Sequence, residues 1–227
     1  MDYYSLSYLL IFVSILITII AQIYVSSSYS KYKKIKNSKE LTGGEVAREI
    51  LDKHGLNNIY VTETRGFLSD HYDPTRKVIR LSREVYSGTS IASVSVAAHE
   101  VGHAIQDKEG YGFMRFRSAM FPLVNLSSKV GYFAILIGIV FSIVDLIWIG
   151  IALELVILLF QLVTLPVELD ASRRAKEEIA KNNFLVSKEQ IGSQRMLRAA
   201  AFTYVASLLT TLIEIFRLVL IARSSDD

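Results

Sequence analysis

The sequence contains no cysteine, only three prolines, one tryptophan and four histidines among its 227 residues. The absence of cysteine excludes disulfides, thiolate metal sites and cysteine nucleophiles. Any tightly bound transition metal must therefore be held by imidazole and carboxylate groups. The imidazoles are those of His54, His71, His99 and His103, so the spacing between them is the first feature to consider.

The chain also lacks a strong charge of either sign. Its 25 basic and 22 acidic residues leave a net charge of +3, which gives no reason to expect a nucleic-acid partner. Hydrophobic residues make up 51% of the sequence, more than is usual for a soluble domain of this size. The composition predicts an α-helical integral membrane protein.

The first 30 residues predict a transmembrane anchor. No charged residue occurs from Tyr3 to Tyr29, and this stretch exceeds the roughly 20 residues that a bilayer core requires. It also lacks the basic start and small-residue cleavage site of a signal peptide. By the positive-inside rule, the lysines that follow predict a cytoplasmic location for what comes next and an outside N-terminus; they are Lys31, Lys33, Lys34, Lys36 and Lys39.

Residues 31–118 form the largest polar stretch and predict a small cytoplasmic α+β unit. Thr42 and Glu45 have the spacing of a capping box, which predicts the start of a helix that Gly55 would end. Two β-leaning runs, NIYVTET and KVIRLS, follow on either side of a predicted loop that contains His71. The run SIASVSVAAHEVGHAIQ then predicts a second, buried helix.

The second half of the chain predicts three further spans, making about four in all. Residues 119–166 are too long for one straight helix across a bilayer, so we expect a transmembrane hairpin that turns near Asp145. Residues 167–198 are polar and predict a cytoplasmic helical segment. Residues 199–227 contain the last span, which places the C-terminus outside with the N-terminus.

The run HEVGH is the strongest functional motif. His99 and His103 are four residues apart, so on a helix their imidazoles lie on one face at a distance that suits a shared zinc ion. Glu100 follows the first histidine and is placed to act as general base on a zinc-bound water that attacks a peptide carbonyl. This arrangement predicts a peptidase with one Zn²⁺ ion.

A catalytic zinc usually takes a third protein ligand and leaves a position open. Glu168, in LPVELDASRRA, is the preferred candidate because it begins a polar segment directly after a predicted span. Asp170 is the fallback, and His71 in its predicted loop is also possible. His54 lies beside Gly55 and is better explained as the end of a helix.

Three separated blocks carry a family resemblance: AAHEVGHAIQ, the upstream SDHYDPTRKVIRLSREVYSGTS and the downstream LPVELDASRRA. Together they resemble the YugP-like family of neutral zinc metallopeptidases of bacterial membranes, from the first anchor to the fourth span. The resemblance implies a membrane-embedded, zincin-like peptidase. Its zinc ligand pair would be His99 and His103, its catalytic residue Glu100, and its downstream ligand Glu168.

The arrangement is also similar to membrane gluzincins such as the CAAX prenyl endopeptidases, in which an aspartate follows the third ligand by four residues. Ser172 stands at that position here, so either Asp170 or Ser172 could orient a ligand histidine. Arg173 could bind a substrate carbonyl or carboxylate. His71, Tyr72 and Arg173 are candidates for stabilising the oxyanion.

The sequence therefore predicts a zinc-dependent metalloendopeptidase of the bacterial cytoplasmic membrane, with its active site facing the cytoplasm. Expected partners are membrane lipid and membrane-associated protein or peptide substrates; nothing in the sequence specifies a regulatory membrane partner. Two alternatives remain open. One is a site-2-type intramembrane protease, although charged residues flank the HEVGH helix too closely for a comfortable span. The other is a non-catalytic zinc-binding membrane scaffold or adaptor.

Overall fold

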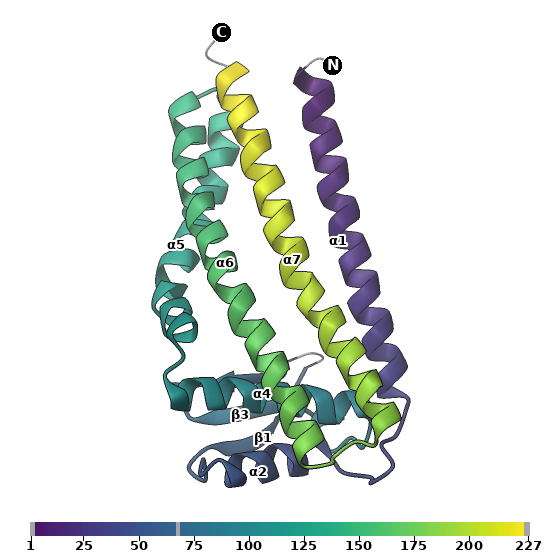
Figure 1. Cartoon of the computed structure of the whole chain (residues 1–227). Helices are drawn as coiled ribbons and strands as arrows, with labels where there is room; N and C mark the ends of the chain where they lie inside the picture. Colours follow the sequence, from purple (N-terminus) through teal and green to yellow (C-terminus); the bar gives the residue numbers. More distant parts are fainter. Residues whose placement is uncertain (1–2, 67–68, 225–227) are drawn as a thin grey trace. The chain divides into compact units, whose positions relative to one another are not determined.

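The computed structural model describes residues 3–66 and 69–224, and Figure 1 shows the course of the chain. Seven helices and three strands occur within these residues. The helices are α1 (Tyr3–Lys33), α2 (Gly43–Lys53), α3 (Arg83–Tyr86), α4 (Ile91–Glu109), α5 (Gly112–Val140), α6 (Val144–Lys181) and α7 (Ser187–Ser224). The strands are β1 (Tyr60–Thr64), β2 (His71–Asp73) and β3 (Val78–Ser82). The fold is mostly helical, with a small sheet.

The chain divides into two compact units. One, here called the apolar unit, consists of the described parts of Met1–Gln22, Arg115–Leu165 and Thr203–Asp227. The other, the polar unit, consists of Ile23–Met114 and Pro166–Phe202. Four helices in the described residues, α1, α5, α6 and α7, are long and apolar enough to cross a membrane.

Small residues let helices pack closely inside the apolar unit. A Cβ atom at Gly150 would lie 2.3 Å from the side chain of Ile135, and one at Gly131 would lie 3.2 Å from Leu153. Such glycine contacts are typical of helix pairs in membranes, where close packing replaces the hydrophobic effect as the source of association. An ion pair of 2.5 Å between Glu214 and Arg217 neutralises two charges within α7.

Two long helices continue through positions where the sequence predicted a boundary between a membrane span and a polar segment. Pro166 lies inside α6, and α7 passes without a break from the polar residues before Ala199 into its apolar part. The turn between α5 and α6 lies at residues 141–143, before Asp145, and Ser142 there adopts a positive φ of 56°. An interior proline costs one backbone hydrogen bond, a cost that surrounding packing can offset, and Pro166 accordingly does not end the helix between the predicted span and the polar segment.

The predicted capping box at the start of α2 is confirmed. The Thr42 side chain accepts a hydrogen bond from the backbone N–H of Glu45, and the Glu45 carboxylate accepts one from the N–H of Thr42. His54 caps the other end of α2, followed by Gly55 with a left-handed φ of 65°. This confirms the prediction that His54 lies at the end of a helix.

The sheet has the order β1-β3-β2. β1 and β3, which correspond to the two predicted strand runs, pair in parallel, so they do not form a hairpin with each other. The third strand, β2, lies in the segment that the sequence predicted as a loop and pairs antiparallel with β3. Asp73 ends β2 and accepts hydrogen bonds from the backbone N–H groups of Thr75 and Arg76, which closes the turn into β3.

Helix α4, which carries HEVGH, forms the centre of the polar unit. From Ile91 to Gln106, every residue except Val96 and His99 is buried. Helices α2 and α3 and strands β2 and β3 all contact it. A helix buried on nearly all sides needs small residues where a neighbour approaches, and Gly102 is such a residue.

Gly102 allows α6 to approach the backbone of α4. A Cβ atom at this position would lie 2.7 Å from the carbonyl oxygen of Ala171 and 3.2 Å from its Cα atom. Because both are backbone atoms, no side-chain rotation can relieve the overlap. The glycine in the middle of HEVGH therefore determines how near the two helices come.

Replacing Gly102 with alanine should destabilise the polar unit by about 1–3 kcal/mol, the usual cost of overpacking a core. The midpoint of thermal unfolding in detergent should fall accordingly. Gly112→Ala is the matched control, because a Cβ atom at Gly112 meets nothing within 4 Å. Equal unfolding midpoints for the two variants would contradict this account of the α4–α6 contact.

Candidate metal centre

The two histidines of the motif project from one face of α4. The helix begins after Ser90, whose hydroxyl accepts a hydrogen bond from the N–H of Ser93, and ends at Gly110 in the left-handed conformation. Between these caps His99 and His103 are one turn apart. Their ring centroids are 4.8 Å apart and their planes are inclined by 82°, so the rings converge without stacking face to face.

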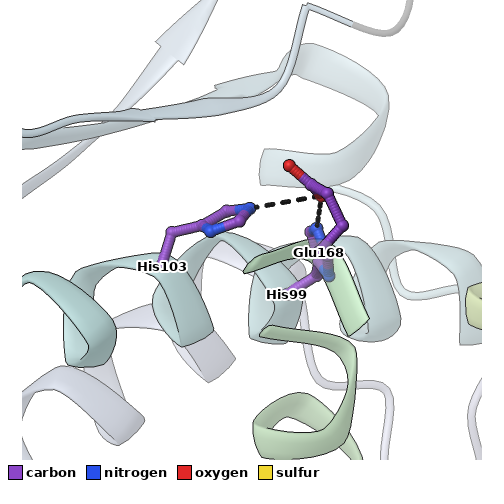
Figure 2. Close-up of side chains that lie close together, drawn as sticks. All are labelled: His99, His103 and Glu168. Atoms are coloured by element: carbon purple, nitrogen blue, oxygen red, sulfur yellow. Dashed lines mark hydrogen bonds and ion pairs between the residues drawn. The ribbon is translucent and has the colours of Figure 1, made fainter. Parts of the chain in front are cut away.

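Glu168, from α6, completes a three-residue cluster. Its Oε2 atom lies 3.2 Å from Nε2 of His99 and 3.5 Å from Nε2 of His103. Figure 2 shows the carboxylate directed at both imidazoles. All three ligand atoms lie within 4.8 Å of one another.

This donor set fits a zinc ion. Two atoms that each lie 2.0–2.1 Å from a tetrahedral zinc are about 3.3–3.4 Å apart, close to the separations of Glu168 from the two histidines. The glutamate is only 3% exposed, and a buried carboxylate between two imidazoles needs a positive charge beside it. Two imidazoles and one carboxylate also match the ligand set of many catalytic zinc sites.

The electrostatic surroundings of His103 also favour a bound cation. Burial by itself would lower the pKa of this imidazole, but the hydrogen bond and negative charge of Glu168, with the charge of Glu100, raise it above its ordinary value. The surroundings thus stabilise positive charge at a buried position. A divalent cation held by these ligands would supply that charge.

The side chain of Glu100 links helix α4 to the sheet. The residue is buried at 8% exposure, and its Oε2 atom accepts a hydrogen bond of 3.0 Å from the backbone N–H of Tyr72 in β2. The Tyr72 hydroxyl donates to Asp107 at 2.7 Å. Burial and this hydrogen bond raise the pKa of the Tyr72 phenol, so the phenol remains a donor, and β2 is held against α4.

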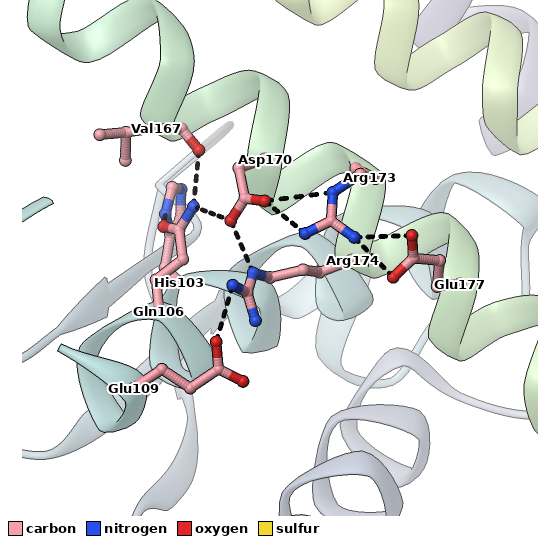
Figure 3. A network of polar contacts seen from close by, with 8 residues as sticks. All are labelled: His103, Gln106, Glu109, Val167, Asp170, Arg173, Arg174 and Glu177. Carbon is pink, nitrogen blue, oxygen red and sulfur yellow. Dashed lines mark hydrogen bonds and ion pairs between the residues drawn. The ribbon is translucent and has the colours of Figure 1, made fainter. Parts of the chain in front are cut away.

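The hydrogen bonds of Gln106 determine which nitrogen of His103 is free. The Gln106 amide nitrogen donates to the Val167 carbonyl at 2.8 Å and to Asp170 at 2.9 Å, as drawn in Figure 3. Its oxygen must then be the atom that faces Nδ1 of His103 at 3.0 Å. Because that oxygen can only accept, Nδ1 carries a proton, and Nε2, on the side of Glu168, is the nitrogen that would bind a metal ion.

Asp170 is held in turn by two arginines. Arg174 donates to it at 2.6 Å and Arg173 at 2.5 Å. The same arginines reach Glu109 and Glu177 respectively, which ties α4 to α6 and continues the network along α6. The network orients Asp170 towards Gln106, and through Gln106 it orients His103.

Ser172 contacts the other ligand histidine. Its hydroxyl lies 3.2 Å from Nδ1 of His99, and Nε2 of the same ring faces Glu168. A serine hydroxyl can accept the Nδ1 proton and fix the ring, as an aspartate would. It brings no charge, so its hydrogen bond with the ring is weaker than that of a carboxylate.

Comparisons with known proteins agree with this geometry. Residues 7–223 match the model of a family described as "Putative neutral zinc metallopeptidase". The chain belongs to this metallopeptidase family. It is also 47% identical over 207 residues, or 91% of the chain and 92% of the relative, to a Bacillus subtilis (strain 168) protein described as "Putative membrane protease YugP". No solved structure matches the chain.

Several of the site residues predicted from the sequence lie outside the cluster of His99, His103 and Glu168. Nδ1 of His71 donates to the Ser69 carbonyl, and its other ring nitrogen faces Arg80 at 3.2 Å. The guanidinium of Arg173 is exposed and paired with two carboxylates. Tyr72 reaches Glu100 through its backbone, while its phenol is directed at Asp107.

Gln106 is the site residue that the sequence reasoning did not single out. It stands three residues after His103 in AAHEVGHAIQ, a spacing that places both side chains on one face of a helix. That spacing was available in the sequence. What the sequence could not show is that the amide meets Val167 and Asp170, because both belong to α6.

We expect Gln106→Leu to weaken zinc binding about 10- to 100-fold, the usual effect of removing a group that orients a ligand histidine. Leucine is similar in size but cannot accept the Nδ1 proton of His103. Zinc affinity is measured by competition with a chelating dye, and thermal unfolding without metal checks that the variant is folded. Gln194→Leu, at an exposed position of α7, is the control. Unchanged affinity in a folded Gln106→Leu protein would contradict the assigned role.

Proposed function

We propose that this family member is a zinc-dependent membrane endopeptidase of the gluzincin type, with a zincin-like polar unit. The observation that carries the proposal is the convergence of His99, His103 and Glu168 beside the buried carboxylate of Glu100. A closed structural site would use a fourth protein ligand. Among the described residues the ligand cluster has three members, which suits a catalytic site better than a scaffold.

Glu100 acts as the general base. The N–H of Tyr72 holds one carboxylate oxygen, so the carboxylate keeps a fixed orientation next to the ligand pair. From there it accepts a proton from the water that attacks the scissile carbonyl and later delivers it to the leaving amine. Because Glu100 is buried, few other water molecules can compete for that proton.

The three ligand residues would hold one zinc ion. When bound, zinc supplies Lewis acidity and lowers the pKa of water towards 7. The protein contributes the neutral Nε2 lone pairs of His99 and His103 and the charge of Glu168. Ser172 and Gln106 keep the two imidazoles in the tautomer that such binding needs.

The first test is Glu100→Gln. The amide cannot act as a base, so peptide hydrolysis by the purified protein should fall by about 10²- to 10⁴-fold. Zinc stoichiometry should be unchanged, because the ligands remain. Glu49→Gln, on the exposed side of α2, is the control for loss of one carboxylate. Full peptidase activity of Glu100→Gln would exclude Glu100 as the general base, whereas an unchanged phenotype of the variant in cells would favour the non-catalytic scaffold.

We also propose that the protein resides in the bacterial cytoplasmic membrane with four spans, the site on the cytoplasmic side and both termini outside. The lysines after the first span support this orientation through the positive-inside rule. Glu168 follows the apolar part of α6 by only a few residues on one unbroken helix. The ligand set is therefore tied to a membrane span, which favours membrane-associated proteins or peptides as substrates.

This preference predicts a difference between two forms of one substrate. A peptide sequence placed next to a membrane anchor should be cleaved with a kcat/KM at least about tenfold above that of the same sequence in a soluble peptide, because anchoring raises its effective concentration. Both are compared with the enzyme in lipid vesicles. Equal rates would argue against membrane-associated substrates, but not against the peptidase itself.

A further inference from the structure

A basic groove lies between α1 and α7, within the polar unit and apart from the metal ligands. Its volume is about 440 Å³, within the range of about 300–1,000 Å³ typical of small-molecule sites. The lining residues are Tyr24, Ser27, Ser28, Lys31, Tyr32, Arg195 and Arg198. None is acidic, three are cationic, and the others offer hydroxyl groups.

The lining residues occupy one face of each helix. Tyr24, Ser27, Ser28 and Lys31 follow the i, i+3, i+4, i+7 spacing of a single face of α1. Arg195 and Arg198 are three residues apart on α7. The three cations therefore face a common groove instead of being spread around the two helices.

Two contacts hold the walls of the groove together. The ring of Tyr24 packs edge-on against Phe202, with centroids 5.9 Å apart. A Cβ atom at Gly192 would lie 2.7 Å from the Tyr32 ring, so α1 and α7 also meet closely there. Near its N-terminal end, α7 is also joined to α4 by a hydrogen bond of 2.7 Å between Ser193 and Ser95. The groove is thus bounded by fixed backbone.

The cations of the groove have no acidic partner within the part of the chain that the structure describes. Throughout residues 3–66 and 69–224, no acidic side chain forms an ion pair with Lys31, Arg195 or Arg198. Lys31 lies over the Tyr32 ring at 5.5 Å, a contact that leaves its charge uncompensated. By contrast, Arg173 and Arg174 in the same unit are paired with Asp170. Three unpaired cations around hydroxyl groups suit an anion with several oxygen atoms.

The position along the chain indicates the kind of anion. The uncharged run of α1 ends just before Lys31, and the apolar run of α7 begins at Ala199, directly after Arg198. On both helices the groove thus lies where apolar sequence meets polar sequence, the level at which lipid headgroups lie if these helices span a bilayer.

We propose that this groove binds the phosphate headgroup of an anionic membrane lipid. Arg195, Arg198 and Lys31 would contact the phosphate oxygens, with Ser27 and Ser28 as hydroxyl donors. The proposal relies on the membrane insertion put forward above but not on peptidase activity. Bound lipid would join α1 to α7 at the end of α1 that leads into the polar unit.

The test compares binding of phosphatidylglycerol with that of phosphatidylcholine to the purified full chain by native mass spectrometry and vesicle titration. The wild type should favour phosphatidylglycerol. The double variant Arg195→Gln/Arg198→Gln should lose roughly thirtyfold in affinity for it, because each cation near an anionic surface contributes about fivefold. The matched control Lys36→Gln/Lys39→Gln removes the same charge outside the groove and should lose less than threefold.

Three results would overturn the proposal. They are no preference of the wild type for the anionic lipid, equal losses in the two double variants, and displacement of the lipid by inorganic phosphate at equal molar concentration. The last would indicate a site for soluble phosphate. Arg195→Lys/Arg198→Lys keeps the charge and guards against misfolding: it should retain most of the preference, with an unfolding midpoint near that of the wild type.

Discussion

The contact of Gly102 with the backbone of Ala171 is the constraint on which the metal cluster depends. It brings α6 close enough to α4 for Glu168 to reach both His99 and His103. A larger residue at the centre of HEVGH would separate the helices and with them the ligands. The ligand pair and its third member are thus linked by packing as much as by chemistry.

Hydrogen bonds and charged groups orient the side chains that helix packing brings together. Each ligand histidine presents one nitrogen to Glu168 and uses the other for orientation, His103 through Gln106 and His99 through Ser172. The two sides differ, because Gln106 is linked to a charged network while Ser172 is a neutral hydroxyl. The rings are therefore held in place by different means, and the more extensive support lies behind the more buried histidine.

Local patterns in the sequence predicted the three residues of the candidate metal cluster. The i, i+4 spacing places His99 and His103 on one helical face whatever the rest of the chain does, and Glu168 stood out as an acid at the end of an apolar run. The capping box of α2 was predictable for the same reason. Local patterns fail where partners come from distant segments, so they could not show that Gln106 meets Asp170.

The sheet and the helix ends illustrate the same limit. Strand β2 is only three residues long and depends on β3 and on the contact of Tyr72 with Glu100, so its own sequence resembles a loop. Pro166 suggested a helix end, because the proline rule is local, yet α6 continues through it. These features depend on tertiary contacts that outweigh local preference.

The order of the ligands along the chain has a consequence for biosynthesis. The ribosome makes His99 and His103 first, then α5 and the apolar first part of α6, and only afterwards Glu168. A nascent chain therefore carries two residues of the three-residue cluster until most of α6 before Glu168 has been synthesised. The candidate metal cluster is therefore completed only after α1, α5 and the apolar part of α6 have been made, so any shorter chain lacks the carboxylate of Glu168.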